Sequence, residues 1–178
     1  MTEADFPLLS LIITIPLLGA LLAGSIRNVD VAKQIAFFTA LITFVLTACA
    51  TLLFDADKSG FQLVERYDWI PLLKIEYLVG VDGISVLFLP MTGLLTITTM
   101  LASWSAISHS SRFHFSLLLA LESVSIGVFC ALDTVLFFLF WELTLPPFFF
   151  LIGLWGIGSQ RRSAAMKYTL FMLAGGVT

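Results

Sequence analysis

Long apolar runs separated by short polar links form the main pattern along this chain. A helix rises about 1.5 Å per residue, so about twenty apolar residues cross a hydrocarbon core about 30 Å thick. The runs predict six membrane-spanning helices, at about 6–24, 31–54, 84–104, 113–131, 132–156 and 164–178. The last run has about fifteen residues where about twenty are needed, so we expect the sixth span to be incomplete.

The composition agrees with this fold class. Hydrophobic residues make up 59% of the 178 residues, charged residues only 12%, and the mean hydropathy is +1.02. No soluble domain of this size needs so much apolar surface. We therefore predict an all-α protein, a polytopic membrane helix bundle whose partners include the lipid bilayer and no nucleic acid.

The charged residues lie mainly in the links. Residues 55–80 mix acids and bases with Tyr67, Trp69 and Tyr77, which predicts a surface loop with a short amphipathic or extended piece along the headgroups. The links after the first, third and fifth runs carry the basic residues Arg27, Lys33, Arg112, Arg161, Arg162 and Lys167. Because cytoplasmic links are enriched in Lys and Arg, we expect the amino terminus to lie outside.

A glutamate stands in the middle of the fifth run. Glu142 follows Leu132 by ten residues, which places it roughly 15 Å along the helix and close to the bilayer midplane. An ionisable side chain at that depth costs about 2.5–3.5 kcal/mol, and a partner or a water-filled path usually offsets the cost. Pro146 and Pro147 follow, and neither has an N–H for the carbonyl four residues earlier. The sequence predicts a polar point that handles ions or protons inside an apolar span.

Two alternatives stay open for this acid. It could be permanently protonated, hydrogen-bonded to a neighbouring helix and important only for packing. It could also be coupled to Glu122 in the fourth run, because the short turn near Leu132 makes an antiparallel hairpin with both acids at equal depth. If the two face each other, repulsion and desolvation keep at least one protonated near neutral pH.

Other polar residues have simpler interpretations. Asp82 stands where the third helix begins and is expected to cap it. His109 and His114 are expected in a solvated interfacial loop. Lys167 can extend to the headgroups as an anchor, although a role in transport is the alternative. A row of threonines spaced four apart predicts a helix-packing face in the second span: Thr39, Thr43, Thr47 and Thr51.

Three motifs resemble a known family. They are VGVDGIS (79–85), GVFCALDTVLFFLFWELTLPPFFFLIGLWG (127–156) and RRSAAMKYTLF (161–171). Together they are similar to the antiporter-like membrane subunits of the chain M (subunit 4) type in proton-translocating NADH:quinone oxidoreductase, respiratory complex I. The resemblance covers nearly the whole chain and is strongest from Gly127 to Leu170. It implies that the chain is the amino-terminal part of one antiporter-like transmembrane domain.

The resemblance also implies roles for particular residues. In this family, a glutamate at the position of Glu142 pairs with a lysine on a seventh helix and passes protons along buried residues. Lys167 lies at the start of the sixth helix and does not match that lysine. Pro147 matches the usual proline of the family, whereas Pro146 is extra and should deepen the kink. No cofactor is implied in this chain; NADH, flavin, iron–sulfur clusters and quinone are expected in partner subunits.

The sequence therefore favours a membrane subunit, or a piece of one, that contributes a midplane glutamate to a proton relay coupled to quinone reduction. Such a subunit is not expected to be active alone, and its partners are protons and other membrane subunits. One alternative is a non-catalytic scaffold or assembly subunit. Another is a subunit of a monovalent cation/proton antiporter or a membrane-bound hydrogenase. We expect a bacterial inner membrane, with the thylakoid membrane as the second choice.

Overall fold

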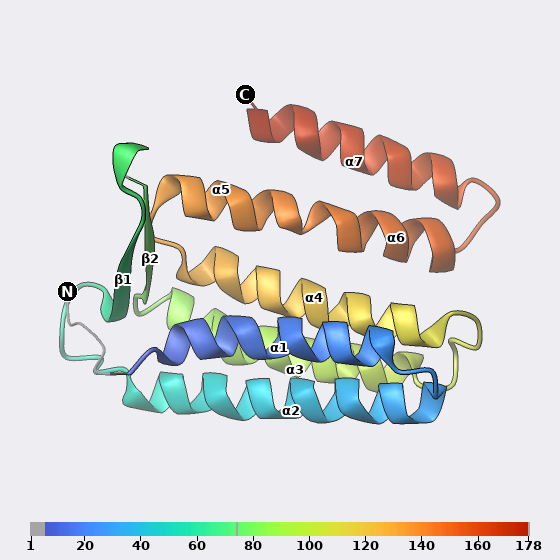
Figure 1. Cartoon of the computed structure of the whole chain (residues 1–178), viewed down its shortest axis with the longest axis horizontal. Coiled ribbons are helices and arrows are strands. Elements are labelled where there is room, and N and C mark those ends of the chain that lie inside the picture. The colour runs from blue at the N-terminus through green and yellow to red at the C-terminus, as the bar shows by residue number, and fades with distance from the viewer. Residues whose placement is uncertain (1–5, 74, 178) are drawn as a thin grey trace.

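A computed structural model describes residues 6–73 and 75–177. Within these residues, helices and one β-hairpin follow each other along the chain (Figure 1). Their bounds are α1 Leu8–Ser25, α2 Val29–Leu53, β1 Gln62–Ile70, the short 3-10 helix η1 Pro71–Leu73, β2 Ile75–Val81, α3 Ser85–Ser103, α4 Ser111–Cys130, α5 Thr134–Leu143, α6 Leu145–Trp155 and α7 Arg161–Val177.

Five segments in this part of the chain are long and apolar enough to cross a membrane. They are α1, α2, α3, α4, and the segment Thr134–Trp155 that contains α5 and α6. The predicted membrane helix bundle is confirmed. The sixth run forms α7, a helix of 17 residues that is not among these five. The predicted loop at 55–80 contains an antiparallel β-hairpin, so the extended piece expected there is present.

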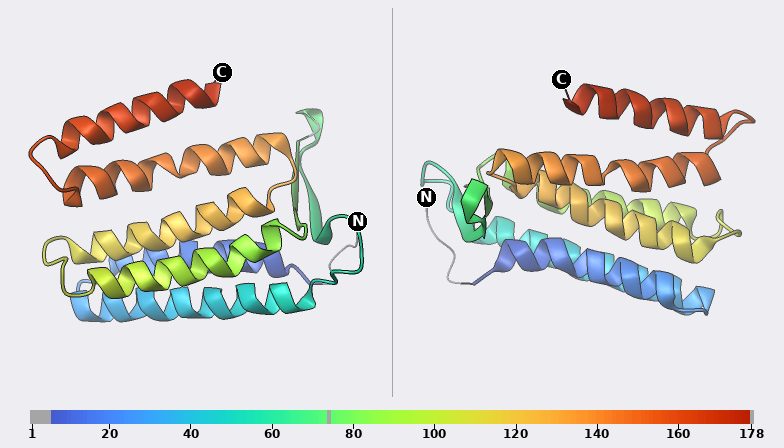
Figure 2. Two further views of the ribbon diagram at one scale, coloured as in Figure 1. Left: turned by 180° about the vertical axis from the view of Figure 1, so that it is seen from behind. Right: turned by 45° about the horizontal axis from the view of Figure 1, so that its top comes forward.

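The helices lie side by side along one direction, with α7 as the outermost layer and α5–α6 beneath it (Figures 1 and 2). Helix α4 contacts α1, α2, α3, α5 and α6, and α7 packs mainly on α6. The hairpin and the α4–α5 turn share one end of the bundle. The three basic links, α1–α2, α3–α4 and α6–α7, share the other end, as alternating helix directions require.

Small and hydroxyl-bearing residues join α1 to α4. The Ser123 hydroxyl donates to the carbonyl of Ile13, and the Ser116 hydroxyl donates to that of Ala20, each over 2.6 Å. Small side chains allow helix backbones to approach closely, and hydroxyl groups then bond across the interface. Helix α4, which also contacts α2, α3, α5 and α6, is the most buried of the five candidate spans.

The threonine row of α2 forms a packing face, as predicted. Thr43 and Thr47 are fully buried, and their hydroxyls donate to carbonyls of their own helix. Thr51 donates both to the carbonyl of Thr47 and to that of Val86 in α3. The hydroxyl groups are thereby satisfied without water inside the bundle.

The fifth span is broken at Thr144. Helix α5 ends at Leu143, α6 begins at Leu145, and Pro146 and Pro147 occupy the first turn of α6. The Thr144 N–H and hydroxyl both bond the carbonyl of Trp141, at 3.2 and 2.7 Å. Because the prolines cannot donate to the preceding turn, the α-helical ladder cannot continue through this point. The predicted kink is thus present as a one-residue interruption of the helix, at which Thr144 keeps helical backbone angles.

A buried acid fastens the hairpin to the bundle. Glu65 of β1 is 4% exposed and accepts a hydrogen bond from the N–H of Leu9, at 2.6 Å. It also accepts from the N–H and the hydroxyl of Ser10, and that hydroxyl lies 2.9 Å from the Tyr77 hydroxyl. A carboxylate at the first turn of α1 satisfies free N–H groups and complements the helix dipole. On the other side, the Leu132 N–H bonds the carbonyl of Leu78.

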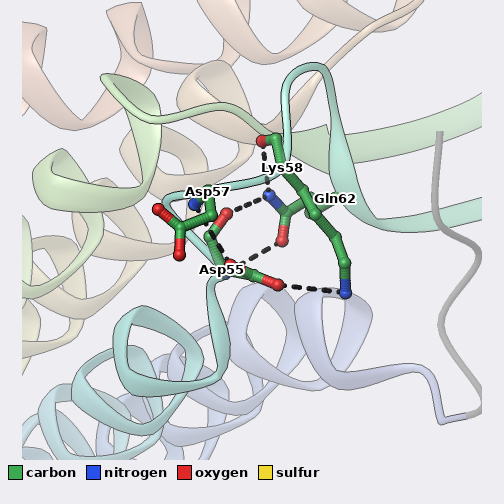
Figure 3. A network of polar contacts seen from close by, with 4 residues as sticks. All are labelled: Asp55, Asp57, Lys58 and Gln62. Carbon is green, nitrogen blue, oxygen red and sulfur yellow. Dashed lines mark hydrogen bonds and ion pairs between the residues drawn. The ribbon is translucent and has the colours of Figure 1, made fainter.

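The link from α2 to the hairpin is held by a polar network (Figure 3). The Gln62 amide donates to the carbonyls of Asp55 and Lys58, and its oxygen accepts from the Asp55 N–H. The Lys58 ammonium bonds the Asp55 carboxylate at 3.0 Å, which lowers the pKa of that exposed carboxyl. Asp82 accepts from the N–H groups of Ile84 and Ser85, so it caps the start of α3 as predicted.

Candidate functional site

The side chain of Glu142 lies in the last turn of α5, directly before the helix break. The residue is partly buried, and its Oε1 atom is covered and lacks a hydrogen-bond partner among the described residues. The last turn of α7 lies close to it, since a Cβ atom added at Gly176 would lie 2.5 Å from Oε1. Glu142 therefore points towards α7, and a side chain at position 176 would require the carboxyl end of Glu142 to shift.

A cavity of about 370 Å³ lies between α5 and α7 beside this acid. Aromatic side chains form most of its wall: Phe137, Phe138, Trp141 and Phe171. Gly176 borders both the cavity and Glu142, so the carboxyl group stands at the edge of the cavity. A buried carboxyl oxygen without a partner is costly in apolar surroundings, and a water molecule or a cationic side chain placed here would satisfy it.

Glu122 occupies a different place. It is 1% exposed in the middle of α4, and neither carboxyl oxygen has a hydrogen-bond partner in the described part of the chain. The residue lines a groove shared with α3, whereas Glu142 faces α7. No hydrogen bond joins the two acids within residues 6–73 and 75–177, so their coupling stays a prediction.

Lys167 lies in the second turn of α7, near the basic end of the bundle. Its side chain is exposed, and neither ion pair found in the described residues involves it. Both of its interpretations, as an anchor or as part of transport, remain predictions. No group of three or more His, Cys, Asp or Glu side chains in the same residues could hold a metal ion.

Two buried polar residues were not expected. His114 was predicted in a solvated loop, but it lies in the first turn of α4 and is 7% exposed, so that prediction is wrong. The ring of Trp155 covers it at a centroid distance of 4.8 Å, because the α6–α7 corner folds over the start of α4. Glu65 was taken as a loop acid. The alternation of buried and exposed residues that is typical of a strand is absent here, because Val64 next to Glu65 is buried as well, so the sequence contains no signal of its burial.

Comparison with known proteins identifies the family. The profile of the family described as NADH:quinone oxidoreductase/Mrp antiporter, TM, matches residues 131–178, which include Glu142 and the helix break. F(420)H(2) dehydrogenase subunit M of Methanosarcina mazei is 36% identical over 165 residues, which make up 93% of this chain and 33% of that protein. Residues 131–178 therefore match this antiporter-like family, and nearly the whole chain is similar to part of the dehydrogenase subunit. The resemblance seen in the sequence is thus confirmed.

Other members of the family are similarly related. NAD(P)H-quinone oxidoreductase chain 4 of Prochlorococcus marinus is 37% identical over 173 residues, covering 95% of this chain and 32% of that protein. The chain therefore spans about a third of the length of the curated relatives it matches.

Solved structures share the fold. A chain of respiratory complex I from Thermus thermophilus with bound NADH matches with a TM-score of 0.81 at 22% identity, covering 94% of this chain and 33% of that chain. A chain of the membrane-bound sulfane sulfur reductase, an archaeal respiratory membrane complex, matches with a TM-score of 0.76 at 23% identity, covering 96% and 26%. These matches support the helix arrangement described above.

Proposed function

We propose that this chain is the amino-terminal part of an antiporter-like domain in a proton-translocating quinone oxidoreductase, where Glu142 binds and releases a proton. One observation carries this role: a carboxyl group with a covered, unpartnered oxygen stands at a helix break inside a membrane span. Intramembrane acids of this kind are rare and usually lie on ion or proton paths. The named relatives, subunits of dehydrogenases and quinone oxidoreductases, support the class of complex.

The chemistry of the relay is a reversible proton transfer to Glu142. With no cation nearby, the carboxylate takes a proton on one oxygen and becomes neutral. A cationic group that approaches favours the carboxylate, and the proton leaves to the next acceptor. The family resemblance implies that this cation is a lysine on a seventh helix. The α5–α7 cavity beside Glu142 is where such a side chain, or a water molecule, would enter.

The free energy for transport comes from outside this chain. Moving one charge across 100 mV costs about 2.3 kcal/mol, so protonation of Glu142 must be tied to an exergonic reaction. We assign that reaction to electron transfer to quinone in partner subunits, which would hold the NADH site, the flavin and the iron–sulfur clusters. We further propose an inner bacterial or thylakoid membrane, with the amino terminus outside and the basic links in the cytoplasm.

The test is Glu142→Gln in the complete complex. Glutamine keeps the size of the side chain but cannot exchange a proton, so we expect electron transfer to continue while fewer protons are pumped per electron. Proton uptake into vesicles is measured separately from quinone reduction. The matched control is Glu76→Gln, which removes a carboxylate from the hairpin, where Glu76 bonds Arg66, outside the membrane spans.

The possible outcomes separate the functional classes. Unchanged pumping by an assembled Glu142→Gln complex would rule out the relay and favour the scaffold. Sodium-dependent transport that is unaffected by quinone-site inhibitors would favour a cation/proton antiporter instead.

A further inference from the structure

A groove lies between α6 and α7, close to the link that joins these two helices. Its volume is about 240 Å³. Two buried small residues, Gly153 and Ala165, meet at its floor, where a Cβ atom added at Gly153 would lie 3.6 Å from that of Ala165. Small residues let helices approach closely, and larger side chains then stand along both sides of the contact. The groove is therefore a narrow slot between two packed helices.

The slot is charged at one end and apolar along the rest. Arg162 is the only charged residue among the described residues that line it. It stands in the first turn of α7, and Met166 lies about 6 Å deeper along that helix. On α6, Leu154 lies next to the link and Phe149 about 7.5 Å deeper. The slot thus has the polarity of a phospholipid, with an ionic end at the membrane boundary and an apolar end inside.

The basic residues of this corner have no acid nearby in sequence. Residues 145–177 contain Arg161, Arg162 and Lys167 but neither Asp nor Glu. Neither of the two ion pairs in the described residues involves these side chains. Both arginines also stand in the first turn of α7, where the helix dipole is itself positive and a cation is unfavourable. An anion at the charged end of the slot would balance this charge.

The size of the slot favours a flexible chain over a helix. One turn of a helix with its side chains is about 10 Å across and 5.4 Å long and fills roughly 400 Å³, which is more than the slot offers. The wall is also held in place, because the Phe150 ring packs on the rings of Phe113 and Phe149, at centroid distances of 5.3 and 5.4 Å. An acyl chain suits a narrow, apolar and fixed space of this kind.

We propose that the groove between α6 and α7 binds one anionic phospholipid, with its phosphate on the Arg162 guanidinium group and an acyl chain between Phe149 and Met166. A guanidinium group can donate two parallel hydrogen bonds to a phosphate. Basic pockets between membrane helices suit lipid headgroups, and each basic residue near an anionic membrane surface strengthens binding about fivefold. This site is separate from Glu142 and does not depend on its role.

The test uses the complete protein in vesicles and two phospholipids that carry the same photoreactive acyl chain. Phosphatidylglycerol has one net negative charge, and phosphatidylcholine has none. After irradiation, mass spectrometry measures the lipid attached to peptides from residues 145–177. We expect phosphatidylglycerol to label these peptides about fivefold more than phosphatidylcholine does, because its charge is balanced by Arg162. Peptides from the middle of α2, where apolar side chains are exposed, should be labelled equally by both lipids.

A pair of variants tests the charged end of the slot. Arg162→Gln removes the positive charge from an exposed side chain, so we expect the two phospholipids to label residues 145–177 almost equally. The matched control is Arg27→Gln, since Arg27 is an exposed arginine in the α1–α2 link at the same end of the bundle and does not line the slot. Its fivefold preference should persist. Soluble glycerophosphate in excess should not compete, because it lacks the acyl chain.

Four results would overturn the lipid site. Equal labelling by the two phospholipids in the unmodified protein would show that the headgroup charge is not recognised. An equal loss of preference in Arg27→Gln would show a general attraction to the basic surface. Competition by glycerophosphate would show an anion site that needs no lipid. Absence of label in residues 145–177, while α2 is labelled, would show that another protein segment covers the slot. Because pumping is not measured, failure here leaves the test of the relay unaffected.

Discussion

Helix α4 and the α5–α6 segment are neighbours that differ in packing more than in composition. The α4 window has a mean hydropathy of 1.7 and is 61% buried, whereas the α5–α6 window, at 2.0, is only 22% buried. The more apolar span is thus the less buried one. In a bilayer, lipid is as apolar as a leucine side chain, so hydropathy does not drive one helix against another.

The difference shows what does bring these helices together. Helix α4 carries two serines that form hydrogen bonds to α1. It also carries Gly127, and the ring of Phe140 from α5 packs against this glycine. The α5–α6 segment carries mostly large aromatic side chains and a break at Thr144. Within this chain, α4 packs closely against its neighbours, and the cavity beside Glu142 lies in the less buried layer between α5 and α7. Each unpartnered acid lies next to an open space: Glu122 lines the groove between α3 and α4, and Glu142 stands beside the cavity between α5 and α7.

The largest expected effect is at the contact between the two regions. A Cβ atom at Gly127 would lie 2.5 Å from the Phe140 ring, so Gly127→Val forces α4 and α5 apart. We expect a loss of about 1–3 kcal/mol in the free energy of unfolding, measured by thermal denaturation in detergent. The control is Gly153→Ala, whose added Cβ would make an ordinary 3.6 Å contact with Ala165. Equal stability of the two variants would contradict a tight contact at Gly127.

A smaller effect is expected between α1 and α4. Ser123→Ala removes the hydrogen bond from the Ser123 hydroxyl to the carbonyl of Ile13 in the neighbouring helix. Interhelical bonds of this type contribute about 0.6 kcal/mol on average and about 1.7 at most, so the loss should lie in that range in the same assay. Ser103→Ala is the control, because the Ser103 hydroxyl bonds only carbonyls of its own helix. A larger loss for Ser103→Ala would mean that the α1–α4 bond is unimportant.

The smallest effect on global stability is expected at the helix break. Replacing both Pro146 and Pro147 with leucine restores two N–H donors, so α5 and α6 should join into one helix. Hydrogen exchange at the amide of Thr144 should slow while the unfolding temperature changes little. The control is Pro90→Leu in α3, where the helix already runs through the proline. Unchanged exchange at Thr144 would mean that packing, and not the prolines, breaks the span.

Local features of this protein could be predicted from sequence. Five of the six predicted spans, the cap at Asp82 and the kink at the paired prolines depend on residues close together in the chain, and the structure contains them. The burial of Glu65 and His114 could not be predicted. Glu65 is buried because the first turn of α1, which lies far from it in sequence, donates free N–H groups to its carboxylate. His114 is buried because the ring of Trp155 covers it.

The sequence by itself indicated which segments are long and apolar enough to cross a membrane and that Glu122 and Glu142 stand within two of them, because length and apolarity are local properties of the chain. Only the tertiary structure decided that Glu122 lines the groove with α3 while Glu142 faces Gly176 of α7. The rotation of each helix about its axis depends on close contacts such as that of Gly127 with Phe140, and residues from different helices make these contacts. The two acids of neighbouring spans therefore reach different surroundings.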